Sequence, residues 1–192
     1  NEGCKASDQI QLTEPAEIKF GSSLKHIDCF EACTGEITFE SVSGGSGVYE
    51  YSADGGLNFQ SSNVITDLCA KIHDLVVRDD NNCEAIDRVE LTEPALLTLE
   101  ITTKDARCFE ECSGSVEAVV TGGTEPYTYT WLNNIAASNE AQASNVCDGT
   151  YDLRVEDAQG CEVDSIGFVV NEPTALTLVF SVVDPSCFGL CD

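Results

Sequence analysis

Cysteine is the residue whose number and spacing most clearly indicate chemistry in this sequence. The chain of 192 residues contains 11 cysteines but only 2 histidines. Its Cys-x3-Cys pairs are followed by widely separated single cysteines, which does not match the short paired spacing of zinc ribbons. We therefore expect the cysteines to form disulfides, which persist in an oxidising compartment.

The cysteines recur with a fixed period, and so do the segments around them. CFEACTG at 29–35 returns as CFEECSG at 108–114, a step of 79 residues. Glu-Pro linkers follow the same step. A period of this size indicates a tandem repeat. We expect a window from a longer array, with a last strand of a preceding repeat at 1–14, complete repeats at 15–93 and 94–172, and a first strand of a following repeat at 173–192.

The elements that carry the cysteines read as short strands. Hydrophobic and polar residues alternate along 114–120, 127–131 and 151–156, and turn signals separate these runs, which is typical of a β-sandwich. We predict an all-β fold of tandem immunoglobulin-like or PKD-like β-sandwich modules stapled by disulfides. Tyr151 lies where such folds place a corner tyrosine, and His73 replaces it in the first repeat.

Composition excludes several classes of partner and activity. With 34 acidic and 9 basic residues the net charge is −25, so nucleic acid and anionic membrane surfaces are poor partners. No apolar run of about 18 residues could insert into a membrane. No catalytic constellation recurs between the repeats, since His26 is replaced by Asp105 in the second. We therefore expect that the protein is not an enzyme.

Immunoglobulin strand order places the Cys-x3-Cys turn and the segment before the sixth strand at the same end of a module. This predicts the disulfides Cys33–Cys69 and Cys112–Cys147. The remaining cysteines leave three arrangements open: bonds within each repeat, a bond across the junction (Cys29–Cys161), or Cys-x3-Cys pairs closed on themselves with Cys69–Cys83. A strand of about seven residues spans roughly 23 Å, which disfavours the first arrangement.

Acidic residues cluster in the linkers and in the turn before each last strand. Carboxylate oxygens suit Ca2+, a hard cation with six to eight oxygen ligands. Candidate ligands are Glu14, Asp79 and Asp80 for the first repeat and Glu93, Glu125 and Asp157 for the second. The alternative is a solvated acidic turn that keeps the chain soluble.

Alternate aromatic residues also admit two interpretations. Tyr127, Tyr129 and Trp131, like Tyr49 and Tyr51, share one face of a strand. They could form a carbohydrate-binding strip, but a sandwich needs a central aromatic residue in its core. We favour the core.

Four motifs together resemble the SprB-type repeat of surface adhesins in gliding and related Bacteroidota. The second repeat carries CFEECSGS, GGTEPYTYTW, VCDGTYDLRVEDAQGC and VNEP; the first lacks the tryptophan and proline and has Lys71-Ile72-His73 where Gly-x-Tyr is expected. The resemblance implies export to the cell surface, commonly by type IX secretion, and extended adhesive filaments. It also implies that the outer cysteines pair within each repeat, as Cys29–Cys83 and Cys108–Cys161.

Two functions follow as hypotheses. The first is a structural or adhesive segment of a long extracellular filament or surface adhesin, a stiff stalk whose partners are neighbouring modules and other copies. The second is a module that binds a glycan or a Ca2+-dependent ligand. No cofactor other than Ca2+ is expected.

Overall fold

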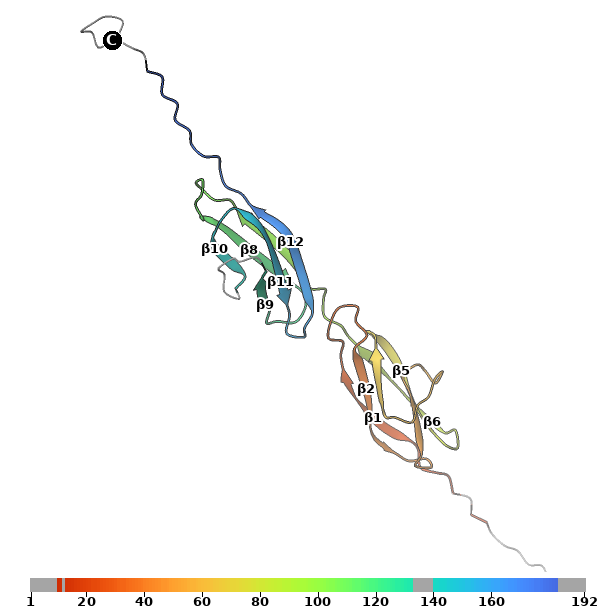
Figure 1. Cartoon of the computed structure of the whole chain (residues 1–192). Helices are drawn as coiled ribbons and strands as arrows, with labels where there is room; N and C mark the ends of the chain where they lie inside the picture. Colours follow the sequence, from red (N-terminus) through yellow and green to blue (C-terminus); the bar gives the residue numbers. More distant parts are fainter. Residues whose placement is uncertain (1–9, 12, 133–139, 183–192) are drawn as a thin grey trace, which may run out of the picture. The chain divides into compact units, whose positions relative to one another are not determined.

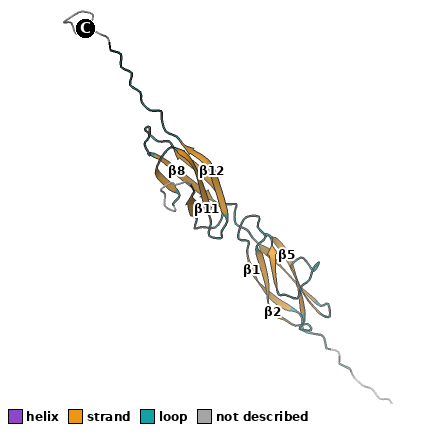
Figure 2. Cartoon of the chain, viewed as in Figure 1, coloured by secondary structure: helices purple, strands orange, loops and turns teal. Residues whose placement is uncertain are grey.

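The computed structural model describes residues 10, 11, 13–132 and 140–182, and these form two compact units. Unit 1 comprises the described part of Asn1–Leu96 together with Gly122–Thr124 and Gln159–Cys161. Unit 2 comprises the described remainder from Leu97 onward. Among the described residues every regular element is a strand, and no helix is present that could cross a membrane (Figures 1 and 2).

Unit 1 is a sandwich of two three-stranded antiparallel sheets. One sheet has the order β1-β2-β4 and the other β3-β5-β6. The strands are β1 (Lys19–Lys25), β2 (Gly35–Ser43), β3 (Tyr49–Ser52), β4 (Val64–Leu68), β5 (Lys71–Asp79) and β6 (Glu84–Leu91). This is the immunoglobulin order A-B-E against C-F-G, without strand D.

Unit 2 repeats the same topology. Its sheets have the orders β7-β8-β10 and β9-β11-β12. The strands are β7 (Thr98–Lys104), β8 (Gly114–Thr121), β9 (Thr128–Trp131), β10 (Gln142–Val146), β11 (Gly149–Glu156) and β12 (Glu162–Val170). The predicted all-β fold of tandem immunoglobulin-like sandwiches is confirmed.

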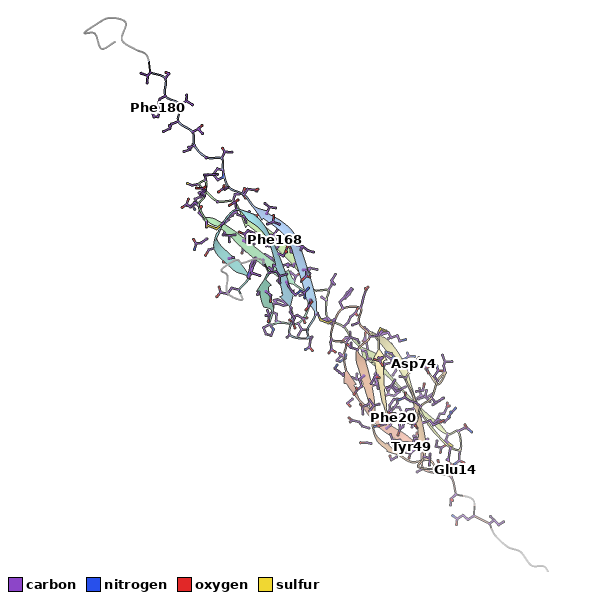
Figure 3. All side chains as sticks on the ribbon, viewed as in Figure 1. Glu14, Phe20, Tyr49, Asp74, Phe168 and Phe180 are labelled. Carbon is purple, nitrogen blue, oxygen red and sulfur yellow. A yellow bond between two sulfur atoms is a disulfide. The ribbon has the colours of Figure 1, made fainter. Side chains whose placement is uncertain are left out.

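Alternation along the strands builds the core of unit 1. Ile37 and Phe39 on β2 and Leu75 and Val77 on β5 are at most 1% exposed. They belong to one cluster, because residues two apart on a strand share a face. Phe20 on β1 extends the cluster, with its ring 5.6 Å from that of Phe39 (Figure 3).

The core of unit 2 is built the same way but uses other aromatic residues. Leu153 and Val155 on β11 are fully buried. Trp131 lies edge-on against Phe168, with ring centroids 6.2 Å apart (Figure 3). Tyr127 and Tyr129 pack against the same core. The alternate aromatic residues therefore serve packing.

The segments expected to flank the two repeats carry no strand in their described parts. Residues 173–182 are without assigned secondary structure, and Leu178 and Phe180 are more than four-fifths exposed (Figure 3). Residues 1–9, 12 and 183–192 lie outside the described residues.

Gly35, which begins β2, gives a test of how tightly the end of unit 1 is packed. A Cβ atom there would lie 2.8 Å from the Leu68 carbonyl oxygen and 2.8 Å from the Leu91 Cδ1 atom. Gly35→Ala should lower the free energy of unfolding by about 2 kcal/mol, because a packed core resists extra volume. Gly21→Ala on neighbouring β1 is the control, since its nearest neighbour is 3.9 Å away. Equal melting temperatures for the two variants would contradict this packing.

Candidate functional site

A disulfide closes one end of each sandwich. In unit 1 Cys33, in the turn before β2, is bonded to Cys69, just before β5; in unit 2 Cys112 is bonded to Cys147. The sequence separations are 36 and 35 residues. The structure therefore contains both bonds that the immunoglobulin strand order predicts.

A third disulfide joins Cys29 to Cys161, while Cys83 and Cys108 are free and exposed. The expected bonds Cys29–Cys83 and Cys108–Cys161 are wrong. Cys83 follows the far end of β5, where Arg78 pairs with Glu84, whereas Lys71 at the near end pairs with Leu91. The nine residues of β5 therefore separate Cys83 from the end of the sandwich that carries Cys29, Cys33 and Cys69. The length of this strand also excludes a Cys69–Cys83 bond. Cys161 instead lies on Gln159–Cys161, which belongs to unit 1.

The Cys-x3-Cys turn of unit 1 is held by a carboxylate from the linker. Glu31 adopts a left-handed conformation, with φ of 56°. Its N–H donates to Glu93 Oε2 at 2.7 Å, and the N–H of Ile27 donates to the Thr92 carbonyl oxygen at 3.0 Å. The turn leaves the N–H of Glu31 without a partner inside the turn, and the carboxylate of Glu93 accepts it. This hydrogen bond stabilises the turn, because an unpaired backbone N–H is costly.

The second repeat has the same arrangement at the same positions. Glu110 has φ of 58° and donates its N–H to Glu172 Oε2 at 2.6 Å. The N–H of Ala106 donates to the Asn171 carbonyl oxygen at 2.8 Å. Sequence reasoning missed this role. The signal was the constant step between the Glu-Pro glutamates and the Cys-x3-Cys turns.

A corner side chain bonds back to the disulfide segment in both units. Tyr151 donates its hydroxyl to the Cys147 carbonyl oxygen at 3.1 Å. In unit 1, His73 Nε2 lies 3.0 Å from the Cys69 carbonyl oxygen, and Nδ1 lies 3.2 Å from the Ala53 carbonyl oxygen. His73 is 2% exposed, so it replaces the corner tyrosine in both packing and hydrogen bonding.

Asp79 organises the turn at the opposite end of unit 1. Its carboxylate is buried and accepts N–H groups of Ser46 (3.0 Å), Asn81 (3.0 Å) and Cys83 (2.8 Å). Burial alone acts to raise the pKa of Asp79, but these donors outweigh it and lower the pKa below its usual value.

Asp54 closes a second acidic turn in unit 1. Its carboxylate accepts the N–H groups of Leu57 and Asn58 at 3.0 Å and the hydroxyl of Ser52 at 2.6 Å. Against the opposing effect of burial, these hydrogen bonds lower the pKa of Asp54 to about 2. The carboxylates of Asp54 and Asp79 therefore accept hydrogen bonds from backbone N–H groups of their own turns.

The six carboxylates expected to hold Ca2+ do not form a site in the part of the chain that the structure describes. No group of three or more His, Cys, Asp or Glu side chains there is arranged to hold a metal ion. Asp79 is occupied by three backbone donors and Glu93 by the N–H of Glu31. The remaining expected ligands are Glu14, Asp80, Glu125 and Asp157, of which Asp157 is buried.

Comparison with known families identifies one match. The SprB repeat model matches residues 101–135, which agrees with the resemblance seen in the motifs. No curated protein matches the chain.

Two solved structures are similar to this chain at low identity. A C-terminal fragment of intimin, solved with the intimin-binding domain of its translocated receptor, is 14% identical, with a TM-score of 0.41 over 82% of this chain and 64% of the fragment. Three N-terminal domains of the Hoc outer capsid protein of bacteriophage RB49 are 15% identical, with a TM-score of 0.41 over 79% of this chain and 58% of that one. The chain thus spans less than two thirds of either.

Asp79→Asn should remove a pH-dependent part of the stability of unit 1. A carboxylate whose pKa is lower in the folded than in the unfolded state stabilises the fold above the unfolded value of about 3.9, and this contribution is lost as pH falls through the folded value. Melting temperatures of wild type and Asp79→Asn should therefore differ at neutral pH and converge in acid. Asp80→Asn, an exposed neighbour in the same turn, is the control. A constant difference from neutral to acid pH would contradict the role of Asp79.

Removing the corner groups should destabilise the two units unequally. His73→Phe removes a buried ring whose N–H donates to one of two carbonyl oxygens and should cost about 2 kcal/mol, whereas Tyr151→Phe removes a more exposed hydrogen bond and should cost about 1 kcal/mol. Denaturant unfolding measures both, and fluorescence of the single tryptophan, Trp131, reports on unit 2. A larger loss for Tyr151→Phe than for His73→Phe would show that these contacts do not fix the corner.

Proposed function

We propose that this chain is a structural segment of an extracellular adhesin-type surface protein, and that its sandwiches act as a stiff, covalently closed stalk. The observation that carries the proposal is that both units close one end of the sandwich with the same arrangement of residues. It consists of a Cys-x3-Cys turn, a disulfide that joins this turn to the segment before β5 or β11, a glutamate from the linker and a corner side chain.

The repeated SprB motif and the disulfides support a location outside the cell. Disulfides form and persist in oxidising environments, and the SprB repeat model matches within unit 2. Export by type IX secretion and assembly into a filament are further parts of this proposal. The excess of acidic residues, with a net charge of −25, keeps such a crowded surface protein soluble.

The disulfides support a mechanical role because they define which residues can be extended by force. The Cys29–Cys161 bond has a sequence separation of 132 residues, and the other two bonds close loops within that span. A pull on the two ends is therefore carried across the covalent bond. Strands β2 to β11 lie inside the closed loop and are protected from extension, whereas β1 and β12 lie outside it.

Single-molecule pulling of the full chain tests this role. The oxidised chain should extend less than the reduced chain by about 450 Å, because the 132-residue loop is released only on reduction, at roughly 3.4 Å per residue. Cys83→Ser leaves all three disulfides intact and should extend like the oxidised wild type. Equal extensions before and after reduction would contradict a covalently protected stalk.

A further inference from the structure

The linker residue before the Glu-Pro glutamate of unit 1 is held at both of its backbone groups. The carbonyl oxygen of Thr92 accepts the N–H of Ile27 at 3.0 Å. The N–H of Thr92 donates to Nδ1 of His26 at 3.1 Å, and the Thr92 hydroxyl oxygen lies 3.1 Å from the same nitrogen. His26 directly follows β1 and is exposed to solvent. The linker is thus attached to unit 1 through an imidazole that water can reach.

Unit 2 makes the same attachment with a different acceptor. Asn171 stands 79 residues after Thr92, and Asp105 stands 79 residues after His26. The N–H of Asn171 donates to Oδ1 of Asp105 at 2.8 Å, and its side-chain amide donates to the same oxygen at 3.2 Å. The carbonyl oxygen of Asn171 accepts the N–H of Ala106. Both units therefore hold the linker at equivalent backbone atoms, one through an imidazole and the other through a carboxylate.

The hydrogen bond from Thr92 requires that Nδ1 of His26 carries no proton. A backbone N–H can only donate, and both ring nitrogens of a protonated imidazole are donors as well. Protonated Nδ1 can still donate to the Thr92 hydroxyl oxygen, but it cannot accept the backbone N–H. Imidazole side chains change charge between about pH 5 and 8, whereas aspartate carboxylates protonate near about pH 3.9. Mild acid therefore removes the acceptor in unit 1 and leaves the acceptor in unit 2.

The charged side chains on the segments that adjoin His26 do not replace this acceptor. They are Lys25, Asp28, Glu31, Glu36 and Glu93. Asp28 accepts the ammonium group of Lys25 at 2.8 Å, and Glu93 accepts the N–H of Glu31 at 2.7 Å. The carboxylates attract an imidazolium and Lys25 repels it, but neither effect gives the N–H of Thr92 a new partner.

We propose that His26 makes the attachment of the linker to unit 1 sensitive to pH. At neutral pH the linker is held at the N–H and at the carbonyl oxygen of Thr92, and in mild acid the N–H is released. The linker after unit 2 stays attached, because an aspartate carboxylate remains ionised there. The two linkers therefore respond differently to the same change of surroundings. This inference rests on the geometry of each unit and goes beyond the stalk role.

Exchange of backbone amides with solvent, measured by NMR on the full chain, tests the proposal. The protection of the Thr92 amide, relative to an unstructured chain at the same pH, should fall about fivefold between about pH 7.5 and about pH 5.5, the size expected for one net hydrogen bond. The protection of the Asn171 amide in the same sample should change by less than about twofold. An unchanged Thr92 amide, or an equal loss at Asn171, would overturn the proposal.

Two variants at position 26 separate this imidazole from other titrating groups. His26→Asp copies the acceptor of unit 2 and should keep the Thr92 amide protected at both pH values, since a carboxylate accepts at both. His26→Ala removes the acceptor and should give low protection at both, with circular dichroism to verify the fold. A loss in His26→Asp as large as in wild type would assign the effect to another group, such as His73, and refute the proposal. The stalk role would survive that result, because pulling measures the disulfides.

Discussion

The disulfide at the end of each sandwich is the interaction on which the rest of each unit depends. In its described residues each unit is a sandwich of six strands that buries a small core, and small domains are marginally stable. Closing a loop of 36 residues contributes about 3–4 kcal/mol in the chain-entropy model, against a total stability of about 5–15 kcal/mol for a typical domain. In unit 1 the bond also fixes the Cys-x3-Cys turn before β2 against the segment before β5. Because β2 and β5 belong to different sheets, the bond joins the two sheets at that end of the sandwich.

Hydrogen bonds around that bond make the end of each unit a single rigid group. The Glu31 turn is left-handed and its N–H is satisfied by the glutamate that begins the next linker. His73 lies within hydrogen-bond distance of the Cys69 carbonyl oxygen, and Tyr151 donates its hydroxyl to that of Cys147. Such groups support one another, since each carbonyl or N–H that finds a partner here would otherwise be costly to bury. The linker glutamate therefore belongs to the sandwich that precedes it, and the Glu-Pro sequence marks where one unit has been completed.

The sequence was sufficient to predict the strands, the repeat and two disulfides, because each leaves a local signal. Alternation along 114–120 reflects a buried face, and the strand order of the fold brings Cys33 next to Cys69. Pairing of Cys29 within its own repeat, which the resemblance implied, was wrong, because the whole of β5 separates Cys83 from the other cysteines of its unit. The strand-length argument from the sequence already disfavoured that pairing and left the observed Cys29–Cys161 bond among the alternatives. The role of Glu93 was missed for a different reason. From the sequence, a carboxylate in the linker resembles a metal ligand. The left-handed backbone at Glu31 leaves an N–H group that donates to Glu93, and the glutamate side chain gives no sign of that conformation in the sequence.

Short and charged edge strands oppose lateral association of the units through their sheets. An edge strand offers unpaired backbone groups to other chains, and short or charged edges oppose such pairing. In both units one edge of each sheet is only four or five residues long, as in β3, β4, β9 and β10. The longer edge β6 carries Glu84, Asp87, Arg88 and Glu90. Lateral contact through the sheets is therefore unfavourable, particularly between acidic surfaces.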